Sequence, residues 1–568
     1  MTQASDGFRK RIVRRTDALD TPLTDAGLLG RLLSSRGLAS QEELDHSLKG
    51  LYPPTLLKGV DEAADILFKA LEADASILVV GDFDADGATS CALMVSVLKS
   101  LGASQVNYLV PDRFRFGYGL SPEIVEVAAA FAPDLLITVD NGIASCDGVA
   151  AAGERGMEVV ITDHHLPGAV LPAAAAIVNP SQPGCEFPSK HLAGVGVAFY
   201  LLSVLRARLR SSGWFEHRQE PNLAEWLDLV ALGTVADVVP LDQNNRRLVA
   251  EGLKRIRAGR SRPGIRALAE VAGVDLNSMV TRDLAFSIAP RLNAAGRLQD
   301  MTVGIECLLA EGDQAVELAT HLDELNRERR EIETDMRDQA MAFLSDLSFD
   351  GEKAAGICLF RENWHEGVVG IIASRVKEKS HRPVIAFARV GKDELKGSGR
   401  SVSGFHMRDA LDAIATSHPG LLIRFGGHAM AAGLSLGAES FEKFVDAFDR
   451  EVRQRLGEAA IEQVVVTDGE LGEAVTINVA RQLESAAPWG QGFPEPEFDD
   501  RFEILEQRIV GGRHLKMLLQ PEIGQPVDAI CFNQGGLVDA RFIRCAYRIE
   551  VNRYRGMERP QLVVSLIL

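Results

Sequence analysis

A chain of 568 residues is several times longer than a typical domain, so two to four separate cores are expected. Its 46% hydrophobic and 25% charged residues give a mean hydropathy of +0.02, which is ordinary for a globular protein and excludes a disordered chain. The formal charge of −18 excludes a surface that is basic overall, but an acidic metal site and a local basic track can coexist within that sum.

The seven cysteines are scattered and include no C-x-x-C pair, which predicts free thiols in a reducing compartment and no zinc knuckle. The basic segment 9–15 is followed by no apolar stretch, and no long uncharged apolar run occurs later. We therefore expect neither secretion nor membrane insertion, and a cytoplasmic location.

Short β-branched runs alternate with helix-like stretches in the first third of the chain. The runs at 77–80, 135–139 and 159–162 are separated by segments such as 89–101 and 141–153, which have helical character. Alternating strands and helices form right-handed crossovers around a mostly parallel sheet. The first domain, within residues 1–312, is therefore predicted to be α/β.

Residues 313–347 have the composition of one long helix, with Asp313 as a candidate N-cap and mixed charge through 323–337. A helix that is polar nearly all round usually bridges two domains. We therefore expect this segment to connect the first domain to a second one.

A smaller α/β domain is expected over residues 348–458. Strands are predicted near 355–360 and 383–387, and glycine-rich loops are predicted around Gly399 and Gly427.

Short alternating strands are expected from residue 459 to residue 568. The alternation is clearest where Tyr547, Ile549 and Val551 are interleaved with polar residues. This pattern predicts a small β-barrel at the C-terminus.

Three carboxylates follow the first strand in one tight turn, which reads Gly81-Asp82-Phe83-Asp84-Ala85-Asp86-Gly87. Like charges so close repel one another unless a cation neutralises them. The D-x-D-x-D-G pattern also begins an EF-hand, but the position that needs a bidentate Glu is Leu93. A P-loop is excluded as well, because no G-K-[ST] follows.

Further candidate ligands follow the later apolar runs. Asp140 ends the second run, Asp163, His164 and His165 follow the third, and Asp237 follows another apolar stretch. In an open α/β sheet, ligands bind at the carboxyl edge of the strands. A single Asp at such a place is more often a helix N-cap than a ligand, but their joint appearance favours a metal centre. Mixed carboxylate and imidazole ligands suit Mn²⁺ or Mg²⁺.

These motifs resemble those of the DHH/DHHA1 phosphoesterase family. The D-x-D-x-D turn, D-N-G at 140–142, D-H-H at 163–165 and G-T-V-A-D-V-V-P-L at 233–241 look like the four motifs of the DHH domain. Four later segments resemble the DHHA1 domain as it occurs in the bacterial RecJ exonucleases, namely 290–297, 364–375, 396–401 and 425–433. The resemblance extends over nearly the whole chain.

The resemblance implies removal of mononucleotides from single-stranded DNA in the 5′ to 3′ direction, in recombination and repair. It implies two Mn²⁺ or Mg²⁺ ions bound by Asp82, Asp84, Asp86, Asp140, His164 and Asp237. Asp140 is expected to bridge the two ions. The resemblance also implies that His165 contacts the scissile phosphate and that Asp163 orients an imidazole. Family members differ in which acids of the first motif bind metal, so the sequence does not decide whether Asp82 or Asp86 is a ligand.

Two regions are expected to hold the strand itself. Arg113 lies where cations alternate with aromatic rings at 111–118, and by resemblance we expect it on DNA, although a surface loop with inward rings is an equal alternative. The C-terminal barrel resembles an OB-fold, which is a frequent platform for single strands.

A third region is expected to hold the end of the substrate. The segment 396–401 offers backbone N–H groups, the hydroxyl of Ser398 and the guanidinium of Arg400, a combination that binds anions, although an ordinary glycine-rich turn is the alternative. By resemblance, Arg291 and His428 take part. Single-strand-binding protein and a RecQ-type helicase are partners that the family's role implies.

Two other functions remain open from the sequence. A relative acting on short oligonucleotides, cyclic dinucleotides or pyrophosphate is disfavoured by the C-terminal domain, because small substrates need no strand track. A catalytically inactive DNA-binding scaffold is disfavoured because each metal motif retains a side chain that can ligate.

Overall fold

The structure is a computed structural model that describes residues 9–15, 27–38, 40–112, 116, 119–347, 354–402, 404–456, 462–554 and 556–568. The chain forms two compact units. The larger unit comprises Arg14–Asn326 and Val466–Leu568, and the smaller unit comprises Met1–Val13 and Arg327–Val465. All seven cysteines are free thiols. No helix in the described part of the chain is long and apolar enough to cross a membrane.

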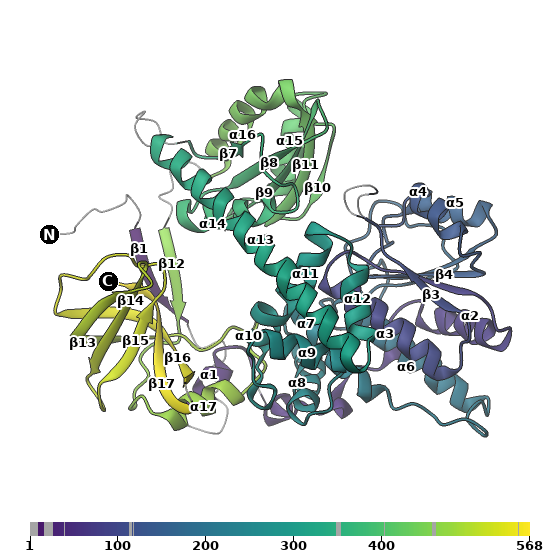
Figure 1. The fold of residues 1–568 in the computed structure, drawn as a ribbon, viewed down its shortest axis with the longest axis horizontal. Helices are drawn as coiled ribbons and strands as arrows, with labels where there is room; N and C mark the ends of the chain where they lie inside the picture. The colour runs from purple at the N-terminus through teal and green to yellow at the C-terminus, as the bar shows by residue number, and fades with distance from the viewer. Residues whose placement is uncertain are drawn as a thin grey trace. The chain divides into compact units, whose positions relative to one another are not determined.

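A five-stranded parallel sheet in the order β3-β2-β4-β5-β6 organises the larger unit, which confirms the predicted fold (Figure 1). Its strands are β2 (Ile77–Val80), β3 (Val106–Leu109), β4 (Leu135–Val139), β5 (Glu158–Thr162) and β6 (Ala176–Val178). Helices α2 (Val60–Glu72), α3 (Ala85–Leu101) and α6 (Gly194–Ser211) lie on one side, and α4 (Pro122–Ala129) and α5 (Cys146–Glu154) on the other. Ile77 and Val79 pack into the first layer and Leu78 and Val80 into the second, as the alternation of a strand requires.

Two helices differ from the predicted ranges for local reasons. Helix α3 begins at Ala85, before the predicted residue 89, because the carboxylate of Asp84 accepts a 3.0 Å hydrogen bond from the N–H of Gly87 and caps it. Helix α5 begins only at Cys146, because Asp140 (φ 62°) and Gly142 (φ 113°) have left-handed backbone conformations that no helix can include.

A helical layer completes the first part of the larger unit. Its main helices are α7 (Leu227–Ala236), α8 (Gln243–Arg257), α9 (Pro263–Val271), α10 (Thr281–Asp283), α11 (Ala289–Leu298) and α12 (Thr302–Leu309). Segment 290–297, which the resemblance places with the DHHA1 domain, lies in α11 and belongs to the larger unit, so that grouping is wrong. The physical reason is a direct contact, because Oδ1 of Asn293 accepts a 2.9 Å hydrogen bond from the N–H of Ala85.

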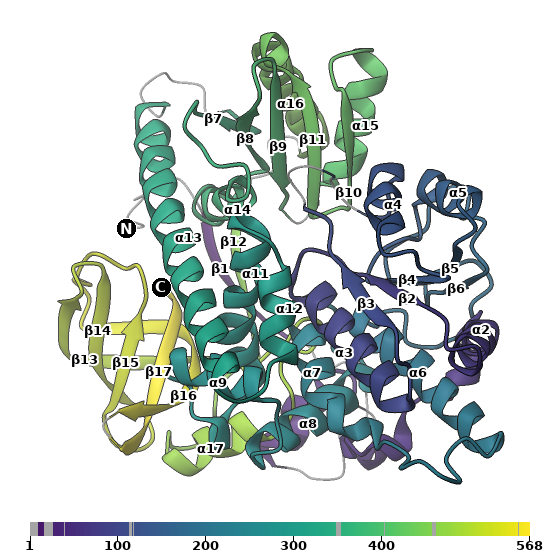
Figure 2. The same ribbon diagram turned by 45° about the vertical axis from the view of Figure 1, so that its right-hand side comes forward.

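The predicted long helix is α13 (Gly312–Leu347), and the division between the two units falls inside it. The smaller unit contains a sheet in the order β10-β11-β9-β8-β7 (Figure 2). Its strands are β7 (Ile357–Phe360), β8 (Val384–Val390), β9 (Glu394–Arg400), β10 (Arg424–Gly427) and β11 (Ala431–Gly437). The end of α13 and α14 (Val369–Ser380) pack on one face, and α15 (Met407–Ser417) and α16 (Phe441–Leu456) pack on the other.

The loop predicted around Gly399 is wrong, because Gly399 lies inside β9. The glycines of this strand are needed for packing, since a Cβ on Gly397 would lie 2.5 Å from Cε1 of Phe387. Gly427 (φ 138°) is the last residue of β10. The second predicted loop is therefore found only after Gly427, since the residues before it belong to the strand.

The C-terminal region is a closed barrel in the order β13-β14-β15-β17-β16, as predicted. Its strands are β13 (Phe498–Val510), β14 (His514–Pro521), β15 (Val527–Cys531), β16 (Phe542–Tyr554) and β17 (Met557–Ile567). Tyr547, Ile549 and Val551 point into its core. The segment before the barrel contains α17 (Ile477–Ser485). Two remaining strands, β1 (Arg9–Arg14) and β12 (Glu462–Thr467), pair with each other.

Candidate metal centre

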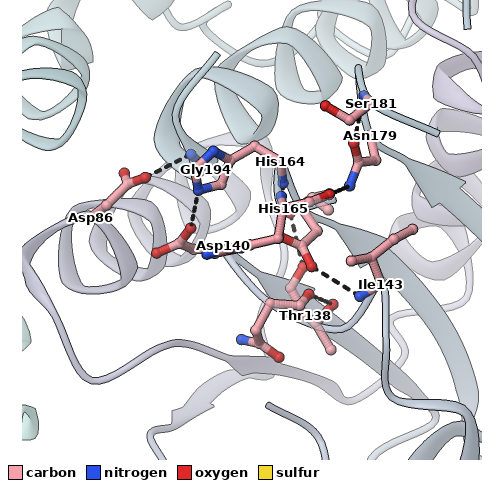
Figure 3. Close-up of polar contacts among 12 residues, drawn as sticks. Asp86, Thr138, Asp140, Ile143, His164, His165, Asn179, Ser181 and Gly194 are labelled. Carbon is pink, nitrogen blue, oxygen red and sulfur yellow. Dashed lines mark hydrogen bonds and ion pairs between the residues drawn. The ribbon is translucent and has the colours of Figure 1, made fainter. Parts of the chain in front are cut away.

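The carboxyl edge of the parallel sheet gathers predicted acids and histidines in the larger unit, and Figure 3 shows Asp86, Asp140, His164 and His165 among them. Strand β2 leads into the turn with Asp82 and Asp84, β4 leads into Asp140, and β5 leads into Asp163 and His164. Neighbouring parallel strands therefore deliver side chains that are far apart in sequence to one place.

Asp86 lies in the first turn of α3 and is only 1% exposed. Its Oδ2 accepts a 2.6 Å hydrogen bond from the N–H of Gly194, and its Oδ1 accepts a 3.0 Å hydrogen bond from the N–H of Val195. The N-cap residue of α6, Ala193, has no side chain that could cap, so Asp86 satisfies the orphan N–H groups of this helix. Burial and the nearby carboxylate of Asp84 raise the pKa of Asp86 to about 7.

Asp140, His164 and Asp237 meet beside this turn. Nε2 of His164 lies 3.0 Å from Oδ1 of Asp140 and 3.5 Å from Oδ2 of Asp237. Asp140 takes its left-handed conformation while its N–H donates a 3.0 Å hydrogen bond to the carbonyl of Thr162. Burial and the surrounding carboxylates raise the pKa of Asp140 and of Asp237 well above the usual range.

Asp163 is fully buried and fixes the second histidine. Its Oδ1 lies 2.8 Å from Nδ1 of His165, and its Oδ2 accepts a 2.9 Å hydrogen bond from the N–H of Ile143. Asn179 donates a 3.0 Å hydrogen bond to the carbonyl of His165. Burial lowers the pKa of His165, but the contact with Asp163 and the neighbouring carboxylates outweigh this and raise it to about 9.

Among the described residues, three overlapping groups place their ligand atoms within 4.8 Å of one another. They are Asp82, Asp84 and Asp140; Asp86, His164 and Asp237; and Asp140, His164 and His165. Several buried carboxylates in so small a volume are unfavourable without positive charge, and oxygen with imidazole nitrogen is the donor set that Mn²⁺ or Mg²⁺ takes. The residues therefore fit a divalent metal centre.

Two glycines that were not predicted as site residues are essential to this packing. A Cβ on Gly194 would lie 2.6 Å from Oδ1 of Asp140, and a Cβ on Gly233 would lie 2.7 Å from Oδ1 of Asp86. Both glycines begin or lie inside apolar helices, where glycine is unfavourable without such a close approach. A glycine at such a position in an apolar helix is the sequence signal that could have identified these two residues.

The residues expected to contact DNA belong to both units of the chain. Arg291 in α11 of the larger unit is buried, and its NH2 lies 2.7 Å from Oδ1 of Asp323 in α13. Ser398, Arg400 and His428 belong to the smaller unit. There, NH1 of Arg400 donates hydrogen bonds to Oγ of Ser398 at 3.0 Å and to the carbonyl of Gly399 at 2.8 Å.

His428 is exposed between β10 and β11, and its N–H donates a 2.7 Å hydrogen bond to the carbonyl of Ala431. Arg113 lies outside the described residues.

Three segments of the chain match known protein families. Residues 76–234 match the DHH family, N-terminal domain; residues 353–454 match the DHHA1 domain; and residues 467–565 match the RecJ OB domain. These matches follow the order of the parallel sheet, the mixed sheet and the barrel along the chain.

Relatives resemble the chain over nearly its whole length. It is 53% identical over 565 residues to the single-stranded-DNA-specific exonuclease RecJ of Dickeya dadantii, which covers 97% of this chain and 98% of the relative. It is 51% identical over 570 residues to the protein of the same name from Escherichia coli, with coverage of 99% and 98%. The solved structure of RecJ from Thermus thermophilus in complex with Mn²⁺ is similar with a TM-score of 0.80 at 32% identity, covering 99% of this chain and 80% of that one.

Proposed function

The chain belongs to the RecJ family of single-stranded-DNA-specific exonucleases, and from this membership we propose that it releases 5′-mononucleotides from single-stranded DNA in the 5′ to 3′ direction. The observation that carries the proposal is the convergence of buried acids and His164 at one edge of the parallel sheet. We also propose the role that the resemblance implies, which is DNA recombination and repair.

Two divalent cations, Mn²⁺ or Mg²⁺, are proposed to bind at this edge. Asp82 and Asp84 would hold one, Asp86, His164 and Asp237 would hold the other, and Asp140, which lies within ligand distance of Asp82 and Asp84 and also of His164, would be shared between them. The sequence does not decide between Asp82 and Asp86 as metal ligands, and in this proposal both are ligands, each of a different ion. When bound, the cations supply Lewis-acid charge that activates a water and stabilises the leaving oxygen. The protein's part is to fix the ligands, which the N–H groups of α6 do for Asp86.

His165 is proposed to contact the scissile phosphate. Its Nδ1 is engaged by Asp163, so Nε2 is the nitrogen that can donate to a phosphate oxygen. Asp163 therefore acts as a positioning residue, because it sets the orientation of the ring through a buried carboxylate that the N–H of Ile143 also holds.

Strand binding is proposed to use residues outside the metal centre. We assign Arg113, Arg291, Ser398, Arg400 and His428 to the DNA, with Ser398 and Arg400 holding the terminal phosphate. The barrel is the proposed platform for the following nucleotides, and Phe532 at the end of β15, 53% exposed and edge-on to His514, offers a ring for stacking. Single-strand-binding protein and a RecQ-type helicase are the proposed partners, in the cytoplasm.

The test is digestion of 5′- and 3′-labelled single- and double-stranded DNA with Mn²⁺, with Mg²⁺ and with EDTA. The expected result is metal-dependent loss of mononucleotides from the 5′ end of the single strand only. Release from the 3′ end, or equal digestion of duplex DNA, would contradict the proposed polarity or substrate. Cleavage of cyclic dinucleotides or pyrophosphate in preference to DNA would favour a small-substrate enzyme.

A further inference from the structure

A hollow of about 360 Å³ lies in the larger unit next to the metal centre. Ala236 and Val238, the two neighbours of the candidate ligand Asp237, line it on one side. Phe286 lines it from the segment after α10, and Trp489 lines it from the segment before the barrel. The lining of the hollow is therefore continuous, along the chain, with a candidate ligand of the metal centre.

Val238 has a conformation that needs an explanation. Its φ is 60°, a left-handed value that is a genuine outlier for a β-branched residue. The strain does not serve burial, because the side chain is 62% exposed. Strained backbone of this kind persists where the surroundings hold it and is concentrated at functional sites. The conformation therefore presents an apolar side chain to the hollow directly after a metal ligand.

Phe286 is displayed by a second unusual element. Residues Leu284–Ile288 form a π-helical turn between α10 and α11, and such turns are rare and frequent at functional sites. Leu284 and Ile288 are fully buried, whereas Phe286 between them is 71% exposed. The turn thus anchors itself in the core and leaves one aromatic ring at the hollow.

The charged groups around the hollow neutralise one another. NH1 of Arg548 lies 3.2 Å from Oε2 of Glu495, and NH1 of Arg282 forms an ion pair with Glu550. A phosphate would therefore gain little net positive charge there, whereas the exposed apolar lining suits a flat, uncharged group. In a single strand of DNA, that group is the nucleobase, which stacks on aromatic rings.

We infer that Phe286 and Val238 form a base-binding subsite, on which a nucleobase beside the scissile phosphate stacks. The inference rests on the proposed function, because it supplies the substrate. It also gives a physical reason for preferring single strands, since a base in a duplex must first leave its partner and its neighbours before it can reach a protein ring.

Binding is tested first, without hydrolysis. Single strands carrying 2-aminopurine at one of the first positions from the 5′ end are titrated with the protein in EDTA. We expect quenching at one of these positions with the unsubstituted protein and with Phe286→Tyr, and its loss with Phe286→Ala. The matched control is Phe131→Ala, a ring 40% exposed at the opposite, amino edge of β4, which should quench as the unsubstituted protein does. If Phe286→Ala quenches as strongly as the unsubstituted protein, the base-binding subsite is wrong and the hollow would instead bind a protein segment.

Turnover is tested second, with Mn²⁺. Phe286→Ala should lower kcat/KM on an ordinary strand by about 5- to 150-fold, the range of one lost base stack. On a strand with an abasic residue at the quenched position, the same substitution should have little further effect. An equal loss on both strands would overturn base recognition. If the unsubstituted protein quenches but does not digest the strand, the exonuclease proposal fails and the subsite stands.

Discussion

Gly194 lies so close to Asp140 that a Cβ atom at position 194 would stand 2.6 Å from Oδ1 of Asp140. The same residue donates its N–H to Asp86, so one backbone position fixes two of the proposed ligands. The start of α6 is therefore part of the metal centre although it contributes no side chain to it.

Gly194→Ala should displace the carboxylate of Asp140 and weaken Mn²⁺ binding by about 10- to 100-fold, which is the usual effect of disturbing a residue that supports a ligand. Calorimetric titration of Mn²⁺ and kcat/KM on single-stranded DNA measure it. The control is Gly153→Ala in α5, where an added Cβ meets nothing within 4 Å. Mn²⁺ affinity that falls equally in both variants would show that the close approach to Asp140 is irrelevant.

Asp84 has two separable roles, as the N-cap of α3 and as a proposed metal ligand. Asn caps helices as well as Asp does, so Asp84→Asn should remain as stable in EDTA as the unsubstituted protein, while turnover falls by at least about a hundredfold through the lost charge. Asp84→Ala should lose the same turnover and also about 1 kcal/mol of stability. Urea unfolding, fluorescence anisotropy of bound DNA and initial rates separate these effects.

Binding of single strands should survive both substitutions at Asp84, because the residues proposed to hold the strand are other residues than the proposed metal ligands. Turnover by Asp84→Asn at the level of the unsubstituted protein would remove Asp84 from the metal centre.

Local sequence was sufficient for the three middle strands of the parallel sheet, β2, β4 and β5, because each is a short apolar run followed by a polar residue, whereas the edge strands β3 and β6 were not predicted. The runs 77–80 and 135–139 coincide with β2 and β4, and the parallel topology then brings Asp82 and Asp140 to one edge without further information. What decides the role of Asp86 is different, since its hydrogen-bond partner Gly194 is 108 positions away. No local pattern contains that contact.

The two wrong predictions, at Gly399 and at residues 290–297, also arise from contacts between segments that are distant in sequence. Glycine is common in turns, so the sequence favours a loop at Gly399, but the neighbouring strands and Met407, whose Sδ would lie 3.1 Å from a Cβ there, make it a packed strand position. Residues 290–297 resemble one domain by motif and belong to the other unit by contact, because Asn293 holds the turn at Ala85. Packing between distant segments decided both cases.

Phe493 joins the segment before the barrel to the core of the first part of the larger unit. It is stacked on Trp489 at 5.2 Å between centroids, and the guanidinium of Arg246 lies 4.3 Å above its ring. Phe493→Ala should lower the free energy of unfolding of the larger unit by about 3–5 kcal/mol, followed by tryptophan fluorescence in urea. The exposed Phe542 is the control, and Phe542→Ala should stay within about 0.5 kcal/mol. If both variants have the same free energy of unfolding, the segment contributes little to this core. A chain that ends before residue 460 would then measure what the barrel contributes to stability.

The last prediction concerns how the enzyme distinguishes an end from the middle of a strand. Every phosphodiester would be alike to the proposed metal centre, so selectivity for an end needs a second anion site that favours a terminal phosphate. Arg400 is the proposed group, because its guanidinium is half-buried and, among the described residues, no carboxylate lies within ion-pair distance of it. Arg389 on the adjacent strand β8 is the opposite case, since its Nε lies 2.6 Å from Oε2 of Glu362.

A terminal monophosphate carries more charge than an internal diester, and a planar guanidinium can hold it with two hydrogen bonds. Hydrogen bonds to charged groups contribute about 1.5–3 kcal/mol, so Arg400→Ala should lower kcat/KM on 5′-phosphorylated strands by about ten- to a hundredfold. The loss should be smaller on 5′-hydroxyl strands, and Arg389→Ala should leave both substrates nearly unchanged. Steady-state rates of the three proteins on the two ends decide the matter, because an equal loss on both ends would show that Arg400 does not recognise the terminal phosphate.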